Sequence, residues 1–276
     1  MTYDKFQIRS QSDDLLLAGY RWTANDPVAA VSLVHGFGEH CGRYQELATH
    51  LVANNIAVTG VDLRGHGKTD SPRGVAGDYD AIHGDVQTLI EETSRLYPDV
   101  PQFLFGHSMG GGLVLHHGMT SSSDSLAGYL VSAPLIRLKR YVPPPVRLAV
   151  KMIRSIMPRA TFPIPVSGKN ISSIPEEQDR YDSDTLSHNR VGFSLAVGMI
   201  EAGESVLKEA TKWDKPLRLW HSKADKITDF QASEQFAGIA SQCQFTAFDE
   251  VQHEMHQDTT RKAVFDLILE FIVERT

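Results

Sequence analysis

The stretch QFLFGHSMGGG at residues 102–112 decides the fold. It begins with an apolar run typical of a buried strand, ends in the pattern Gly-x-Ser-x-Gly, and is followed by residues that can continue as a helix. A serine on such a tight turn has a strained backbone, and Gly106 and Gly110 leave out Cβ atoms that would clash there. The stretch therefore predicts a nucleophile elbow that presents Ser108. The N–H of Met109, at the helix N-terminus, can face a developing oxyanion.

Strand and helix patterns alternate on both sides of this stretch. Short apolar runs predict strands at residues 29–34, 56–61, 129–132, 217–220 and 244–248. Apolar residues at helical spacing predict helices near residues 44–52, 82–93, 232–239 and 264–272. The first thirty residues instead predict an antiparallel hairpin at one edge of the sheet. We therefore expect an α/β fold with a mostly parallel twisted sheet, helices on both faces, and ligands at the carboxyl ends of the strands.

The alternation breaks after Pro134 and resumes after about Lys212. Prolines punctuate the first part of this interval, and the second part has a helical pattern. We interpret residues 134–212 as an inserted helical cap. The core is then formed by residues 1–133 and 213–276.

Composition narrows the function classes. The chain has 276 residues and a formal net charge of −7, which argues against nucleic acid as the main partner. The two cysteines, Cys41 and Cys243, form no CxxC or zinc spacing. The start lacks the apolar core of a signal peptide, and no run of about 18 apolar residues occurs, so we expect a cytoplasmic protein.

Two motifs resemble nucleotide-binding loops without matching them. Gly67-Lys68-Thr69 resembles the end of a phosphate-binding loop, but Asp62 stands where that loop needs its first glycine. In the segment that begins at Gly36, the third glycine of a dinucleotide fingerprint would fall on Cys41. We expect no nucleotide and no other cofactor.

A serine nucleophile needs a base and an orienting carboxylate, which should follow later strands in the order Asp, then His. Asp225 and His253 follow the strands that end near residues 220 and 248. Asp229 is the rival acid, although it is better placed to cap the next helix, and His256 is the rival base. The cluster HEMH at 253–256 lacks the HExxH spacing of zinc proteases, so we expect no metal.

Several segments together resemble one family. HGFGEHCGRY at residues 35–44, DLRGHG at 62–67, GHSMG at 106–110 and the segments around Asp225 and His253 look like the monoacylglycerol lipase and lysophospholipase group of α/β-hydrolases. The likeness runs through nearly the whole chain and is weakest in the cap.

The resemblance implies a catalytic triad of Ser108, Asp225 and His253, with the backbone N–H groups of Phe37 and Met109 as the oxyanion hole. It implies an ester hydrolase that cleaves monoacylglycerol to fatty acid and glycerol through an acyl-enzyme. A lysophospholipase or a general carboxylesterase is the alternative. From a different class, a hydrolase-like receptor would bind a lipid ester with little turnover.

The interval interpreted as a cap is locally basic on an acidic chain. Residues 137–169 hold eight Lys or Arg residues and no Asp or Glu, and they surround a strongly apolar helical segment at 146–157. This helix either lies on an anionic membrane surface as a peripheral contact or covers the site with its basic residues in solvent.

Overall fold

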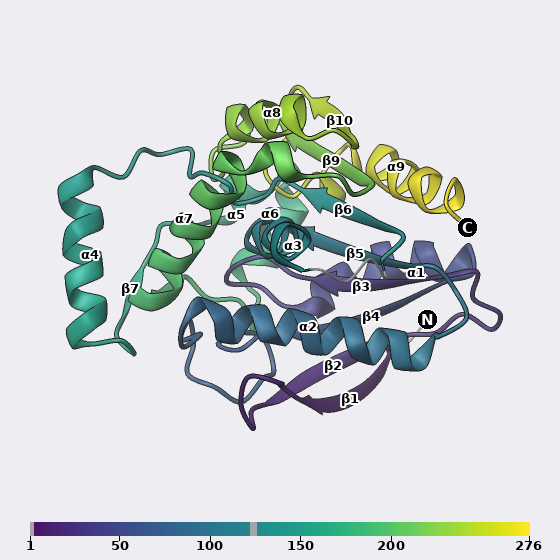
Figure 1. The fold of residues 1–276 in the computed structure, drawn as a ribbon, viewed down its shortest axis with the longest axis horizontal. Helices are drawn as coiled ribbons and strands as arrows, with labels where there is room; N and C mark the ends of the chain where they lie inside the picture. The colour runs from purple at the N-terminus through teal and green to yellow at the C-terminus, as the bar shows by residue number, and fades with distance from the viewer. Residues whose placement is uncertain (1–2, 122–125) are drawn as a thin grey trace.

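An eight-stranded sheet forms the centre of the protein in a computed structural model, which describes residues 3–121 and 126–276 (Figure 1). Across the sheet the strands are β1 (Asp4–Arg9), β2 (Leu16–Trp22), β4 (Ile56–Asp62), β3 (Ala29–Val34), β5 (Gln102–His107), β6 (Gly128–Ser132), β9 (Leu217–Ser222) and β10 (Cys243–Phe248). Strand β2 pairs antiparallel with both β1 and β4, and all other neighbours are parallel. The predicted edge hairpin and parallel sheet are both confirmed.

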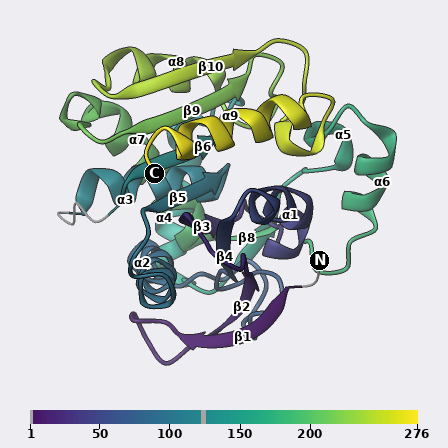
Figure 2. The same ribbon diagram turned by 90° about the vertical axis from the view of Figure 1, so that its right-hand side faces the viewer.

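Helices cover the two faces of this sheet (Figures 1 and 2). One face packs against α1 (Gln45–Ala53), which follows the 3-10 turn η1 (Cys41–Tyr44), and α9 (Arg261–Val273). The other face packs against α2 (Tyr79–Leu96), α3 (Met109–Thr120) and α8 (Phe230–Ile239). Because both faces are covered, β3, β4, β5 and β6 are buried along their whole length, which explains their continuous apolar sequences.

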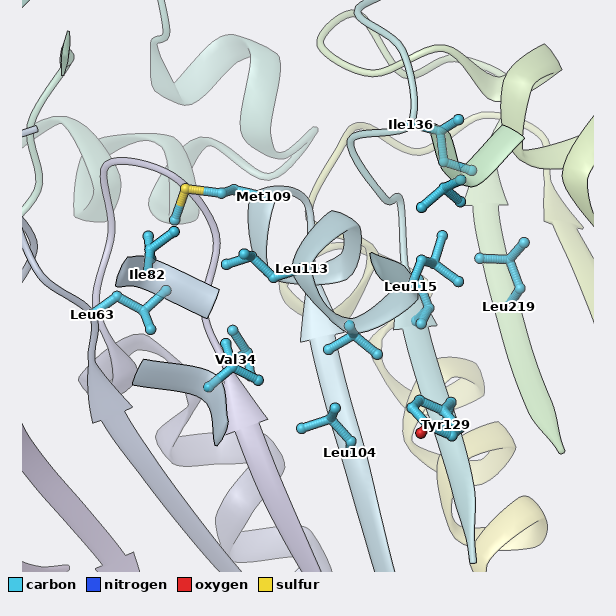
Figure 3. Packing of buried hydrophobic residues seen from close by; sticks show 14 of the residues in the cluster. Val34, Leu63, Ile82, Leu104, Met109, Leu113, Leu115, Tyr129, Ile136 and Leu219 are labelled. Carbon is cyan, nitrogen blue, oxygen red and sulfur yellow. The ribbon is translucent and has the colours of Figure 1, made fainter. Parts of the chain in front are cut away.

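The core between α3 and the sheet fixes the turn that carries Ser108. Figure 3 shows Leu104 on β5 and Leu113 on α3 in one cluster with Val34, and all three are fully buried. Burying a leucine side chain stabilises a fold by about 1.5–3 kcal/mol. The strand before the turn and the helix after it are therefore both anchored in the core.

The chain between β6 and β9 forms a separate group of short elements. They are α4 (Pro144–Ile156), β7 (Thr161–Pro163), α5 (Gly168–Ile171), α6 (Pro175–Asp182), β8 (Arg190–Gly192), α7 (Phe193–Lys208) and the 3-10 turn η2 (Ala210–Lys212). The apolar helix predicted here corresponds to α4. The antiparallel pair β7 and β8 was not predicted, since strands of three residues are too short to show a pattern.

Helix α4 stands at the end of the molecule, away from the sheet, and none of its residues is buried (Figure 1). Its basic side chains form ion pairs with α7: Arg147 with Glu204, and Lys151 and Arg154 with Glu201. These three basic side chains remain 32%, 53% and 42% exposed, so the ion pairs lie at the surface in contact with solvent. Leu148, Met152 and Ile156 are 60%, 59% and 79% exposed. Among the described residues, no helix is long and apolar enough to cross a bilayer.

Candidate active site

Ser108 lies on a strained turn between β5 and α3. Its φ of 55° and ψ of −117° fall where residues other than glycine are rare. A Cβ on Gly106 would lie 2.4 Å from the carbonyl oxygen of Gly110, and a Cβ on Gly110 would lie 2.3 Å from that of Val34. The steric reason for both glycines is thus confirmed. The backbone strain at Ser108 marks a functional position.

Asp225 and His253 are brought together from the loops after β9 and β10. Nδ1 of His253 donates to Oδ2 of Asp225 over 2.6 Å, and both side chains are buried. The rival Asp229 caps α8 by accepting from the N–H of Gln231. The rival His256 stacks on Tyr44 at a ring distance of 4.8 Å, and burial lowers its pKa to about 3, which makes it a poor base.

The protonation states of this pair are set by burial and by each other. Burial lowers the pKa of His253, but the charge and hydrogen bond of Asp225 outweigh burial and hold that pKa above its usual value. Burial raises the pKa of Asp225, but His253 and the neighbouring His221 outweigh it and keep that pKa well below its usual range. Asp225 is therefore ionised at neutral pH and favours a proton on His253.

Ser108 and His253 border the same cavity, which has a volume of about 560 Å³. Most of its wall is apolar and comes from the chain between β6 and β9, including Val146 and Val150 of α4 and Val197 and Ile200 of α7. No hydrogen bond joins the Ser108 hydroxyl to His253 among the residues described. In sites without substrate, this contact is often long.

Two backbone N–H groups beside Ser108 come from separate loops. Met109 is the first residue of α3, so its N–H has no acceptor within the helix. Phe37 follows β3 and also lines the cavity. Its loop is held by Glu39, whose Oε1 accepts from the N–H of Gly36 over 2.5 Å and from the hydroxyl of Tyr44 over 2.6 Å.

A buried ion network that was not predicted from the sequence lies beside the cavity. Arg43 donates to Glu39 over 3.2 Å and to Glu254 over 2.7 Å, and all three side chains are nearly inaccessible. Glu39, Glu254 and His107 have ligand atoms within 4.8 Å of one another, a spacing that would suit a metal. However, the Arg43 guanidinium already supplies the positive charge between the carboxylates. Glu39 lies in a loop outside any helix, and the contact between Arg43 and Glu254 joins residues 211 positions apart, so no local sequence pattern indicated the network.

The network predicts a pH effect on stability. Burial, with a further contribution from the Glu39 charge, raises the pKa of Glu254 to about 7 despite Arg43. The folded state holds this proton more tightly than the unfolded state does. The contribution of Glu254 to the free energy of unfolding therefore decreases as the pH rises from about 4.5 to above 7. Between pH 5 and pH 8, the unfolding free energy of the wild type should fall by about 1–3 kcal/mol more than that of Glu254→Gln.

Urea unfolding at the two pH values measures this difference. The exposed Glu250→Gln is the matched control and should behave as the wild type does. Equal pH dependence in the wild type and Glu254→Gln would contradict the prediction.

Fold and sequence together define a carboxylic ester hydrolase of the α/β-hydrolase class. Residues 25–260 match the family described as serine aminopeptidase, S33, and the chain belongs to this family. It is similar to the monoglyceride lipase of Mus musculus, with 30% identity over 217 residues, 78% of this chain and 71% of that protein. It is also similar to the monoacylglycerol lipase of Mycolicibacterium smegmatis, with 27% identity over 91% of both chains.

A third relative and a solved structure extend this comparison. An uncharacterized abhydrolase domain-containing protein of Dictyostelium discoideum is 33% identical over 96% of this chain, but the chain spans only 28% of that protein's length. The crystal structure of the Paleococcus ferrophilus monoacylglycerol lipase superimposes with a TM-score of 0.85 and 27% identity, covering 94% of this chain and 99% of that one. The predicted fold class and the resemblance to monoacylglycerol lipases are thereby confirmed.

Proposed function

We propose that the protein hydrolyses monoacylglycerols to fatty acid and glycerol through an acyl-enzyme on Ser108. The observation that carries the proposal is that Ser108 and the paired His253 border one mostly apolar cavity. An acyl chain would lie along the apolar wall. The glycerol would face the polar residues Glu39 and Glu254, which line the same cavity.

In the first half-reaction, Oγ of Ser108 attacks the ester carbonyl carbon while Nε2 of His253 takes the serine proton. Asp225 stabilises the imidazolium that forms. The N–H groups of Phe37 and Met109 donate to the oxyanion, and such a donor typically contributes about 2.7–4 kcal/mol in the transition state. Glycerol leaves with the proton from His253.

In the second half-reaction, a water gives its proton to His253 and attacks the acyl carbon. The bond to Oγ then breaks, Ser108 regains a proton from His253, and the fatty acid leaves. No metal or other cofactor enters either half-reaction.

We also propose that residues 134–212 act as the cap of this site. The support is that α4 and α7 both contribute cavity lining, whereas the sheet end contributes Ser108. A cap that encloses one acyl chain should disfavour diacylglycerols and triacylglycerols, which carry two or three acyl chains.

The electrostatics beside Ser108 favour glycerol over a phosphate-bearing alcohol. Glu39 and Glu254 share the single guanidinium of Arg43 there. Because the pKa of Glu254 is about 7, this group gains a net negative charge as the pH rises through 7, and it would then repel an anionic headgroup. This favours the monoacylglycerol hypothesis over the lysophospholipase hypothesis.

A rate comparison tests the proposed function. The panel is a monoacylglycerol, a lysophosphatidylcholine, a diacylglycerol, a triacylglycerol, a short-chain p-nitrophenyl ester and an aminoacyl p-nitroanilide. We expect the highest kcat/KM on the monoacylglycerol. A higher value on the anilide would overturn the proposal in favour of a peptidase. Covalent labelling by a fluorophosphonate without turnover of any ester would point to the receptor alternative.

Helix α4 leads to a prediction about membrane contact. Its exposed apolar side chains can enter a bilayer, whereas Arg147, Lys151 and Arg154 are already paired with α7. We therefore expect the protein to co-sediment with neutral vesicles, and we expect any gain from anionic lipid to come from basic residues outside α4, such as Lys139, Arg140 and Arg159. Met152→Glu should reduce the bound fraction severalfold.

Val273→Glu is the matched control, because Val273 is 57% exposed on α9 and Met152 is 59% exposed on α4. Its bound fraction should equal that of the wild type. Equal loss in both variants, or no binding of the wild type to either vesicle, would remove the membrane hypothesis.

A further inference from the structure

The Asp225 carboxylate accepts more hydrogen bonds than the orientation of one histidine requires. Its Oδ1 accepts from the backbone N–H groups of Ile227 over 2.7 Å and Thr228 over 3.1 Å. Its Oδ2 contacts Nδ1 of His253 at 2.6 Å, Nε2 of His221 at 2.9 Å and Oγ1 of Thr228 at 2.9 Å. Two imidazoles therefore meet at the same carboxylate oxygen.

The surroundings of His221 determine its tautomer. The side chain is fully buried near the end of β9, and its Nδ1 lies 2.8 Å from Oγ of Ser233 on α8. Burial lowers the pKa of His221, although Asp225 partly opposes this, so the ring is neutral at pH 7. With the hydroxyl of Ser233 donating to Nδ1, the ring proton is on Nε2, which donates to Asp225.

We propose that His221 is a positioning residue that holds Asp225 against His253 and, by sharing Oδ2, limits how strongly the carboxylate attracts a proton onto His253. The inference rests on the proposed function, in which His253 is the base. A hydrogen bond to an ionised carboxylate stabilises its charge, so each added donor leaves less of that charge for His253. Without His221, His253 would hold its proton more tightly, and Asp225 would be less firmly placed.

Other titratable groups also face this pair. His107 lies 4.6 Å from His253 between ring centroids, and burial keeps the pKa of His107 well below its usual value. The carboxylates of Glu39 and Glu254 act on His253, and that of Asp229 acts on His221. All of these groups remain when His221 alone is replaced, so a change in the titration of His253 reports the lost contact at Oδ2.

The test compares the wild type with His221→Phe, which keeps a ring but has no donor. NMR titration of the His253 imidazole and the pH dependence of fluorophosphonate labelling at Ser108 both measure the pKa of His253. We expect His221→Phe to raise this pKa by about one unit. We also expect kcat to fall about tenfold because Asp225 is less well placed. KM should stay unchanged, since His221 does not line the cavity.

Two further variants separate positioning from packing. His221→Gln retains an N–H donor and should lie closer to the wild type in both pKa and kcat. His117→Gln removes a histidine that is equally buried at the far end of α3, and it should leave the His253 titration unchanged. A folded His221→Phe with the wild-type pKa would overturn the proposal, even if its kcat fell. If the wild type neither labels nor hydrolyses any ester, the proposed function fails, but NMR still tests the role of His221.

Discussion

Ser108→Ala is expected to lower kcat for monoacylglycerol by about 10⁴-fold or more, because no other group on the turn can form the acyl-enzyme. Stability should change little. Alanine keeps the Cβ of serine, so the strained backbone at φ 55° is no worse accommodated, and the lost hydroxyl faces the cavity. Initial rates and thermal unfolding of the purified variant measure the two effects.

The control for this variant is another buried serine. Ser32 on β3 is 1% exposed and bonds to Thr93 over 2.8 Å, away from the cavity. Ser32→Ala should retain activity and react with a fluorophosphonate, whereas Ser108→Ala should do neither. Substantial turnover by Ser108→Ala would show that the nucleophile is another residue.

The core of the fold could be predicted because its strands are buried on both faces. A strand covered on two sides needs a continuous apolar run, and the predicted range 29–34 matches β3 residue for residue. The hairpin β1–β2 could be predicted from alternation because only part of each strand is covered. Both signals are local in the sequence.

The chain between β6 and β9 could not be predicted in the same detail, because its structure depends on contacts far away in the sequence. The short strand β8 is held partly by Gly192, whose N–H donates to the carbonyl oxygen of Gly74 over 2.9 Å. The ion pairs of α4 lie with α7, more than forty residues along the chain. No local pattern indicates either partner.

The residues of the candidate site could also be predicted only in part from the sequence. Ser108, Asp225 and His253 could be named because each follows a predicted strand at the same edge of the sheet. His253 was predicted over His256 from the sequence, and the three-dimensional environment supports that prediction, since the ring of His253 meets Asp225 and that of His256 meets Tyr44. His221 also lies at the end of a predicted strand, β9, as the triad candidates do. The order Ser, Asp, His along the chain has no place for it, so the sequence did not indicate its role.

The same environment predicts the effect of Asp225→Asn, which we expect to lower kcat by about 10⁴-fold. Oδ1 accepts two backbone N–H groups, from Ile227 and Thr228, so the amide oxygen of asparagine would take that position. The amide NH₂ would then replace Oδ2 and face Nδ1 of His253 as a donor. His253 would have to accept there and carry its proton on Nε2, the tautomer that cannot take the proton of Ser108.

Asp229→Asn is the matched comparison, because asparagine is as good an N-cap as aspartate and α8 should stay intact. Its kcat should lie within about twofold of the wild type. The pair of variants thus decides between the two acids that the sequence offered. A large loss in Asp229→Asn with a small one in Asp225→Asn would reverse the assignment. Equal and small losses would mean that neither carboxylate orients the base, and His253 would then act without the charge that its buried position requires.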